Sequence, residues 1–290
     1  MAMQITRAFL KELELQPHRS LGQYLLVDEQ VVKDIVNALN ILRDDEIVEV
    51  GSGIGVLTSA IINEFKKFKG GRQNLTAVEI DKRYSEYMKK YFHDENVLKV
   101  VNKDMLKFRF NEYFKKPVKV AGNIPYYISS PLLRMLFDNH KLVSVIVIML
   151  QKEVGLRVFA DPENKKYNEY YGLLSIMRKL HYDAEIIRTV DRNSFLPVPD
   201  VDSIVIRLKV HKPLLECDEE KILLRILKPA FNARRKMLKN ALKSTGTQEE
   251  IKKWSDAANI DLNDRIENID LGRLKLFLKA YVGDKGKGSL

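Results

Sequence analysis

Short β-rich runs alternate with helical patterns through the first two thirds of this 290-residue chain, and this alternation limits its possible folds more than any other feature. Runs typical of strands occupy residues 46–50, 75–80, 98–101, 118–121 and 143–150. Helical periodicity occupies residues 31–39, 56–65, 82–92 and 131–139, and then 151–160 and 171–179. Strands that alternate with helices form parallel sheets covered on both faces, so we expect an α/β fold.

Two later strand-like runs, residues 184–190 and 203–210, follow each other closely, which predicts an antiparallel pair. Five strand–helix units and such a pair would form a Rossmann-like seven-stranded sheet of the class I methyltransferase kind. Periodicity alone also fits a dinucleotide-binding dehydrogenase. After residue 211 the strand signals stop, and residues 219–244, 248–258 and 271–281 have helical patterns. We therefore expect one domain at residues 1–211 and a small all-α domain at 212–290, with a disordered tail at 283–290.

The net charge favours a polyanionic partner. Lys and Arg number 49 against 39 Asp and Glu, which gives a formal charge of +10 and a pI near 9.4. This balance is typical of proteins that bind nucleic acid, although many other basic proteins share it. The single cysteine, Cys217, excludes an intrachain disulfide, and the five histidines lack ligand spacing, so we expect no metal site. We find no secretory signal and no apolar segment of membrane-spanning length, so we expect a cytoplasmic protein with no membrane partner.

A glycine-rich turn, Gly51-Ser52-Gly53-Ile54-Gly55, follows the first strand and opens a helix. The missing side chains let the backbone approach a ligand closely, and the helix N-terminus offers free N–H groups. The turn alone is weak evidence, since tight strand-to-helix turns look the same. The second strand ends near Glu79, whose carboxylate can accept hydrogen bonds from a ribose diol, whereas Asp81 is better placed to cap the next helix. Asp104, after the third strand, can accept a hydrogen bond from an adenine amine or serve as a turn residue.

The segment Asn123-Ile124-Pro125-Tyr126 ends the fourth strand and is the strongest chemical signal. An adenine N6 is a poor nucleophile because its lone pair is delocalised into the ring. If the Asn123 amide oxygen and the Ile124 carbonyl accept the two N6–H bonds, electron density moves toward a methyl donor. Tyr126 would stack on the base and hold it in line with the donor carbon. The alternative is a simple Asn-Pro turn at a strand end.

Several segments together carry a family resemblance: Leu21-Gly22-Gln23, Gly51-Ser52-Gly53, Asn123-Ile124-Pro125-Tyr126, residues 150–154, 194–199 and 201–203, Phe231-Asn232-Ala233-Arg234-Arg235-Lys236, and residues 265–269. In combination they resemble the small-subunit ribosomal RNA adenine N6,N6-dimethyltransferases of the KsgA type, over residues 19 to 278. The resemblance implies that the first domain binds S-adenosylmethionine, releases S-adenosylhomocysteine, and dimethylates two adjacent adenosines of 16S rRNA during ribosome assembly. With Gly53 of the glycine-rich turn, the residues expected to contact this cofactor are Tyr24, Leu26, Gly51, Glu79, Asp104 and Asn123.

The resemblance also implies that Phe195 helps to sandwich the target base. An aromatic side chain just before two prolines would be exposed on a stiff loop, although it could instead anchor that loop in the core. The chain departs from the family in two places. Tyr24 stands where the family has Asn, so a polar contact there must come from its backbone or phenol. The basic stretch at residues 66–72 lengthens the interval between the glycine-rich turn and Glu79, and could add an RNA contact.

Residues 221–248 contain eight basic side chains and no acidic one. On the expected helix three of them share a face and two flank it: Arg235, Lys239 and Lys243, with Arg234 and Lys236. Phe231, Leu238 and Leu242 would turn another face inward. A basic face suits phosphate contact, although it could be only a solvated surface. We therefore expect residues 212–290 to contact RNA, with the target adenine unstacked in a loop or in an immature small ribosomal subunit.

Three alternatives remain open. A large-subunit rRNA adenine methyltransferase of the macrolide-resistance type shares the cofactor motifs, but residues 234–236 and the match of the second domain argue against it. A non-catalytic ribosome assembly or RNA-binding factor could keep the same fold, although the intact Asn123 and Tyr126 favour an enzyme. A nicotinamide-dependent oxidoreductase would need a proton donor near the glycine-rich turn, and we find none. The resemblance suggests a monomer.

Overall fold

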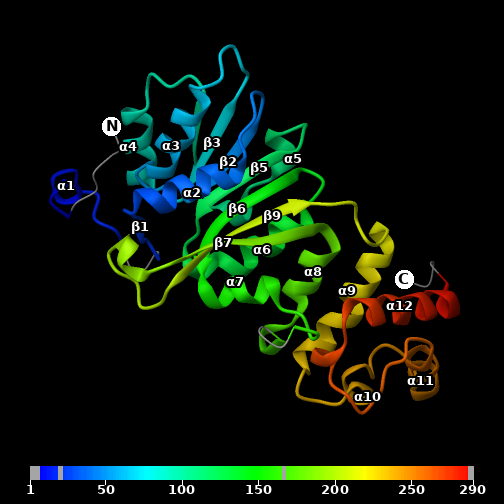
Figure 1. Ribbon diagram of the computed structural model, residues 1–290. Helices are drawn as coiled ribbons and strands as arrows, with labels where there is room; N and C mark the ends of the chain where they lie inside the picture. The colour runs from blue at the N-terminus through cyan, green and yellow to red at the C-terminus, as the bar shows by residue number, and fades with distance from the viewer. Residues whose placement is uncertain (1–6, 19–21, 165–167, 287–290) are drawn as a thin grey trace. The chain divides into compact units, whose positions relative to one another are not determined.

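The computed structural model describes residues 7–18, 22–164 and 168–286, which form a mixed α/β structure (Figure 1). The strands of its main sheet are β2 (Glu46–Val50), β3 (Asn74–Glu79), β4 (Leu98–Asn102), β5 (Val118–Asn123), β6 (Val143–Gln151), β7 (Tyr182–Val190) and β9 (Ser203–Val210). They lie in the order β4-β3-β2-β5-β6-β9-β7. β2 to β6 run parallel to one another, whereas β9 is antiparallel to both β6 and β7. The predicted α/β fold with a seven-stranded Rossmann-like sheet is therefore confirmed.

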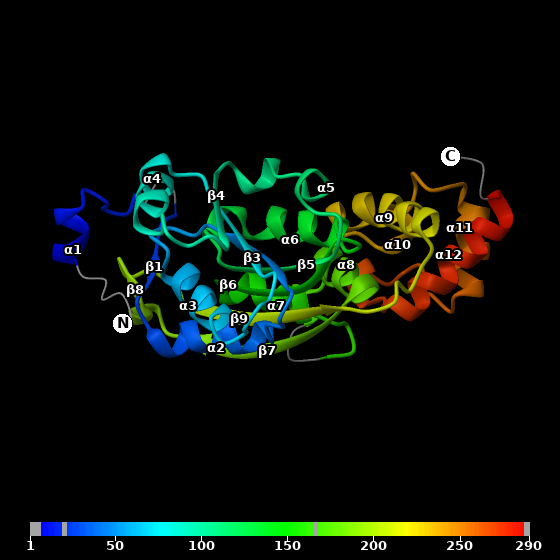
Figure 2. The ribbon, with the colours of Figure 1, turned by 90° about the horizontal axis from the view of Figure 1, so that it is seen from above.

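Helices cover both faces of this sheet. The helices of the first 140 residues are α1 (Arg7–Glu12), α2 (Glu29–Leu39), α3 (Val56–Phe65), α4 (Lys82–Tyr91), α5 (Phe110–Tyr113) and α6 (Ser129–Asp138). α2 begins after Asp28, whose side chain accepts hydrogen bonds from two N–H groups of the first turn. α2 and α3 pack against Val145, Val147 and Met149 of β6, and α6 lies on the other side of the sheet (Figure 2). Because both faces are buried, β6 is an unbroken apolar run from Val145 to Leu150.

The order of the strands creates a place for a ligand. The strand order reverses at β2: the chain proceeds from β2 through β3 to β4 on one side, and then returns to β5 on the other side of β2. In open α/β sheets, ligands bind outside the carboxyl ends of the strands at such a reversal. The glycine-rich turn follows β2, Glu79 ends β3 and Asn123 ends β5. The topology therefore brings the three main sequence signals to one edge of the sheet.

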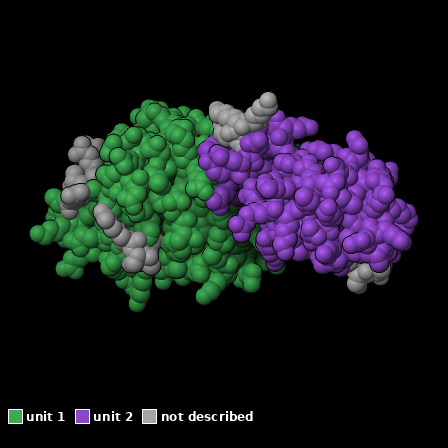
Figure 3. Space-filling model, turned by 90° about the horizontal axis from the view of Figure 1, so that it is seen from below, with its two compact units in different colours: residues 1–155, 182–211 green, residues 156–181, 212–290 purple. Residues whose placement is uncertain are grey.

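The chain divides into two compact units, residues 1–155 with 182–211, and residues 156–181 with 212–290 (Figure 3). α7 (Lys152–Phe159) follows β6 and includes the boundary at residue 155. The second unit also contains α8 (Leu173–His181), α9 (Cys217–Asn232), α10 (Leu238–Ala241), α11 (Gln248–Ala257) and α12 (Leu271–Lys285). Residues 156–181 were expected in the first domain, but Tyr171 and Ile176 pack in the core of the second unit with Leu223.

The prediction of one long basic helix at residues 219–244 is wrong. α9 ends at Asn232, and a turn separates it from the short α10. The N–H groups of Leu238 and Lys239 bond to carbonyls of the distant loop 262–264 instead of to a preceding helical turn. A single helix therefore cannot continue through this segment, and the basic residues assigned to it do not share one helix face.

The C-terminal helix is longer than the sequence indicates. α12 continues to Lys285, so residues 283–285 of the expected disordered tail are helical, and residues 287–290 lie outside the described part of the chain. Among the helices that the structure describes, none is long and apolar enough to cross a membrane. The described residues also hold no group of three or more His, Cys, Asp or Glu that could bind a metal ion.

Candidate active site

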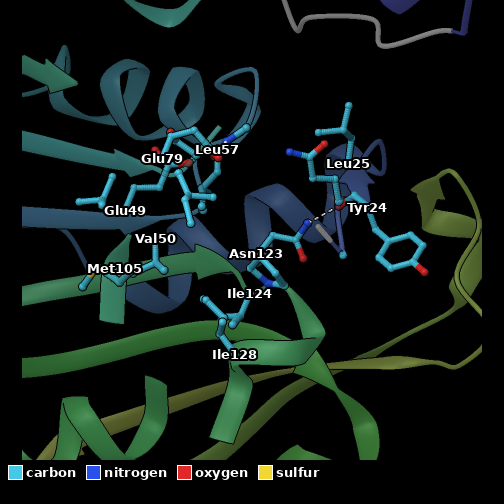
Figure 4. Close-up of a pocket in the computed structure, with 18 of the residues that line it drawn as sticks. Tyr24, Leu25, Glu49, Val50, Leu57, Glu79, Met105, Asn123, Ile124 and Ile128 are labelled. Atoms are coloured by element: carbon cyan, nitrogen blue, oxygen red, sulfur yellow. Dashed lines mark hydrogen bonds between the residues drawn. The ribbon is translucent and has the colours of Figure 1, made fainter. Parts of the chain in front are cut away.

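A pocket opens at the carboxyl ends of β2, β3 and β5, lined by the glycine-rich turn and by residues 22–26, 103–105 and 123–128 among others (Figure 4). Gly51, Gly53 and Gly55 have φ angles of 67°, 55° and 90°, a region that glycine adopts at little cost. A side chain at Gly55 would also meet Met88 Sδ and Phe92 Cε2 at 2.6 Å. The turn that begins α3 therefore requires glycine.

Glu79 has both carboxylate oxygens engaged at the end of β3. Its Oε2 accepts the Gly53 N–H at 2.8 Å, and its Oε1 accepts the Asp81 N–H at 2.8 Å. The side chain is 5% exposed, and burial raises its pKa. Asp81 caps α4 by accepting the Arg83 N–H at 3.0 Å. Glu79 thus faces the glycine-rich turn, and the interpretation of Asp81 as a cap is confirmed.

Glu49 lines the same pocket, and the sequence analysis missed it. It lies in β2, is 1% exposed and accepts a hydrogen bond from Thr58 Oγ1 at 2.5 Å. Burial raises its pKa to about 8, and the nearby Glu79 adds to this effect, so the carboxyl is mostly protonated at neutral pH. The sequence does contain a signal for this residue, because Glu49 is an acidic residue in an otherwise apolar strand just before the glycine-rich turn.

Asp104 lines the pocket beyond the end of β4. Its Oδ1 accepts the Leu106 N–H at 2.9 Å, and this bond caps the short helix η2 (Met105–Lys107). The two interpretations of Asp104 are therefore compatible, because a carboxylate has a second oxygen that can accept from a ligand.

The side chain of Asn123 has a fixed orientation. Its Nδ2 donates to the carbonyl oxygen of Tyr24 at 2.7 Å (Figure 4). A carbonyl oxygen can only accept, so the amide nitrogen must face Tyr24 and the amide oxygen remains an acceptor for another group. A side chain at Gly51 would meet Pro125 Cδ at 3.4 Å and the Asn123 carbonyl oxygen at 3.5 Å. The segment 123–126 is therefore in close contact with the glycine-rich turn.

Tyr126 is held at both ends. The preceding backbone is fixed by the Ile124 N–H, which donates to the Met149 carbonyl at 2.9 Å. The Tyr126 hydroxyl forms a hydrogen bond with Ser203 Oγ at 3.0 Å, at the start of β9. Its ring stacks on that of Tyr24, with centroids 5.2 Å apart and planes at 29°. The sequence analysis missed both contacts because Ser203 and Tyr24 lie far from Tyr126 in the chain.

The expectation of an exposed Phe195 is wrong. β8 (Phe195–Leu196) pairs with β1 (Leu25–Leu26), which places Phe195 opposite Leu26. The Phe195 side chain is 2% exposed and packs in a core that includes Val190 and Val205. Leu26 lines the pocket, whereas Phe195 is not among the described residues that do so. Phe195 anchors its loop in the core instead.

The basic residues expected to contact RNA have two different environments. Arg234 is paired with Glu267 of the same unit through Nε at 2.6 Å. In the basic stretch at 66–72, Lys66 and Lys67 are likewise paired with acidic side chains. The other four residues of the expected helix face are exposed on the second unit: Arg235, Lys236, Lys239 and Lys243.

Comparison with known proteins places this arrangement among RNA-modifying enzymes. Residues 14–280 match the family described as ribosomal RNA adenine dimethylase. The ribosomal RNA small subunit methyltransferase A of Alkaliphilus metalliredigens is 35% identical over 275 residues, which cover 92% of each chain. That of Clostridium acetobutylicum is 33% identical over 270 residues, which cover 92% of this chain and 94% of the relative.

Solved structures agree with the sequence match. A dimethyladenosine transferase from Plasmodium falciparum has a TM-score of 0.69 and 27% identity, and the alignment covers 90% of this chain and 98% of that one. The 23S rRNA methyltransferase ErmE has a TM-score of 0.66 at 21% identity, with coverage of 89% and 99%, and supports the fold alone.

Proposed function

Because this chain belongs to the ribosomal RNA adenine dimethylase family, we propose that it transfers methyl groups from S-adenosylmethionine to N6 of two adjacent adenosines in 16S rRNA. The observation that carries this proposal is the intact acceptor segment at the sheet edge, with the Asn123 amide oriented by Tyr24. Relatives named for the small subunit, at 32–35% identity, favour that target over the large-subunit alternative.

The pocket fits S-adenosylmethionine. Ser52 Oγ is buried without a hydrogen-bond partner in the described structure, so it is available to a ligand. Gly51 and Gly53 would let the cofactor approach the backbone closely. Glu79 would accept hydrogen bonds from the ribose hydroxyls, and Asp104 would accept a hydrogen bond from the adenine amine of the cofactor. When bound, the cofactor supplies an electrophilic methyl group on a sulfonium, and S-adenosylhomocysteine is the product.

The acceptor side is formed by residues of this chain. Asn123 Oδ1 and the Ile124 carbonyl would accept the two N6–H bonds of the target adenine, which directs the nitrogen lone pair toward the methyl group. Tyr126 would stack on the base, and its hydroxyl bond to Ser203 keeps the ring in place. This arrangement acts mainly by positioning two reactants, which can supply a large part of the rate enhancement. The product nitrogen loses its proton to solvent after transfer.

We assign RNA contact to the second unit and catalysis to the first. The exposed cations at residues 235, 236, 239 and 243 suit phosphate groups. The substrate would be an immature small subunit, in which the adenines can be unstacked, and the enzyme would act as a cytoplasmic monomer.

Methylation of isolated ribosomal subunits tests this function. The chain is incubated with labelled S-adenosylmethionine and with small or large subunits from cells that lack these methyl groups. We expect two dimethyladenosines in 16S rRNA, identified by mass spectrometry of nuclease fragments. Asn123→Ala should lower the rate at least about 100-fold, as for loss of other groups that stabilise a transition state, while RNA binding is retained. Label only in 23S rRNA would contradict the proposal.

A further inference from the structure

Basic side chains follow the edge of the main sheet next to the pocket. Among the strands that the structure describes, β4 is at the end of the sheet and pairs only with β3. Residues 98–109, which include β4 and η2, contain a single acidic residue, Asp104, and four basic ones. The basic residues are Lys99, Lys103, Lys107 and Arg109. This edge of the first unit therefore carries a net positive charge.

Two of these lysines are gathered on one aromatic ring. Lys99 Nζ lies 5.0 Å from the centre of the Tyr113 ring, and Lys103 Nζ lies 5.8 Å from the same centre. The face of an aromatic ring attracts a cation because its quadrupole is negative there. The ring of Tyr113 is itself supported, since it stacks on the buried Phe108 with centroids 4.3 Å apart. The core of the unit thus holds the ring that brings the two ammonium groups together.

The two ammonium groups are not neutralised by the protein. Within the described part of the chain neither Lys99 nor Lys103 forms an ion pair with a carboxylate, whereas Lys66 and Lys67 of the same unit do. Two positive charges close to one ring repel each other, and a negative charge between them would remove this repulsion. The arrangement is therefore complementary to an anionic group of another molecule.

This pair of lysines adjoins the acceptor segment 123–126. Lys103 lines the pocket together with Asp104 and Tyr127. Burial raises the pKa of Tyr127, and the Asp104 carboxylate adds to this effect, so these two side chains lie near each other. Tyr127 directly follows the acceptor segment, and η2 contacts α6, which begins two residues later. Nucleotides that flank an adenine in the acceptor site would therefore lie within reach of Lys103.

Lysines on an edge strand can also serve another purpose, because they discourage pairing with a strand of another chain. That role needs only exposed charge and does not require two lysines on one ring. Lys103 is half-buried and follows the last residue of β4, Asn102. Its position suits a ligand at the mouth of the pocket better than it suits protection of the strand.

We propose that Lys99 and Lys103 bind phosphate groups of the RNA strand next to the target adenine. This rests on the proposed function, and it adds a contact on the first unit to the exposed cations of the second. RNA is favoured over an acidic protein surface because the adjoining pocket acts on RNA. S-adenosylmethionine has no phosphate group, so the cofactor does not compete for the site. Such contacts fix the position of the strand without reading its sequence.

Binding of a single-stranded oligouridine tests the phosphate contact without any methyl transfer. Its binding constant is measured by fluorescence anisotropy between about 50 and about 200 mM salt. Each phosphate contact with a single strand contributes about 0.7 to the slope of the logarithm of the binding constant against the logarithm of the salt concentration. We expect Lys99→Ala and Lys103→Ala each to reduce this slope by about 0.7. Lys99→Arg and Lys103→Arg should retain the slope, because the charge is kept.

Lys141→Ala is the matched control. Lys141 is an exposed lysine of the same unit, and no ion pair with a described carboxylate involves it. It lies just before β6, so it is at the opposite end of the parallel strands from the pocket. Its substitution should leave the slope unchanged. If Lys103→Ala fails to fold, Lys103→Gln, which keeps most of the side chain without its charge, takes its place.

Methylation of small subunits shows whether the contact serves the reaction. Lys103→Ala should raise KM for the subunits about 10-fold, as for loss of a hydrogen bond to a charged group, and Lys141→Ala should not change it. The calorimetric affinity of Lys103→Ala for S-adenosylhomocysteine should stay within about twofold of wild type. A loss of this affinity that matches the rise in KM would assign Lys103 to the cofactor and overturn the proposal.

Two other results would also overturn it. A salt slope equal to that of wild type in both alanine variants would show that these lysines do not contact phosphate. A higher KM for subunits without any effect on oligouridine would indicate an acidic protein surface as the partner instead. Absence of methyl transfer by wild type would refute the proposed function, whereas the oligouridine measurement would still decide whether the two lysines bind phosphate.

Discussion

Gly55→Ala should destabilise the first unit by about 2–4 kcal/mol. Gly55 has a φ of 90°, and a left-handed backbone costs a residue with a side chain about 1–2 kcal/mol. The new methyl would also lie 2.6 Å from Met88 Sδ and from Phe92 Cε2. Overpacking of this kind costs about 1–3 kcal/mol, and the flexible Met88 side chain brings the effect toward the lower end.

The measurement is urea unfolding followed by circular dichroism. Tryptophan fluorescence would be misleading, because the single tryptophan, Trp254, packs in the core of the second unit. Gly283→Ala is the control. It lies in α12, where a Cβ would meet nothing within 4 Å, so alanine should be neutral or stabilise by up to about 1 kcal/mol. A Gly55→Ala variant within about 0.5 kcal/mol of wild type would refute the reasoning that the turn requires glycine.

Three further predictions concern other parts of the structure. Glu49 has a folded-state pKa of about 8, above its value in the unfolded chain, so stability falls as the pH rises from about 5 to 8, by up to about 1.4 kcal/mol per pH unit. Glu49→Gln should flatten this dependence in urea titrations at pH 5 to 8, and an unchanged slope would contradict the raised pKa. Phe195→Ala should lower the free energy of unfolding by about 3–5 kcal/mol, because the side chain is buried. A variant that loses methylation of RNA but keeps the melting temperature of wild type would contradict this and favour contact of Phe195 with the target base. Lys236→Ala and Lys243→Ala should each weaken RNA binding and reduce by about one the slope of the logarithm of the binding constant against the logarithm of the salt concentration. A salt dependence equal to that of wild type would show that these lysines do not contact the RNA.

The alternating pattern predicted most of the first unit because hydrophobic periodicity reports local structure directly. The strands β2 to β6 and the helices α2, α3, α4 and α6 lie within a few residues of their expected positions, whereas the short α5 was not predicted. The glycine-rich turn, Glu79, Asp104 and Asn123 line one pocket because parallel strands end at a common edge, which is a property of the topology rather than of any single motif.

The remaining features depend on long-range contacts. The start of α10 is held by hydrogen bonds from the Leu238 and Lys239 N–H groups to carbonyls of the loop 262–264, which no local pattern contains. Phe195 is buried because its two-residue strand pairs with β1, and a strand so short has no periodicity to detect. The raised pKa of Glu49 and the stacking of Tyr24 on Tyr126 likewise arise from burial and proximity in the folded chain.

The most direct test of the account is a crystal structure of the chain with S-adenosylhomocysteine and a short RNA that contains the target adenines. We predict that one adenine N6 lies about 3 Å from both Asn123 Oδ1 and the Ile124 carbonyl oxygen, and faces the cofactor sulfur. An adenine whose N6 bonds to other groups, or an Asn123 amide turned so that its nitrogen faces the base, would contradict the claim that this segment holds the acceptor.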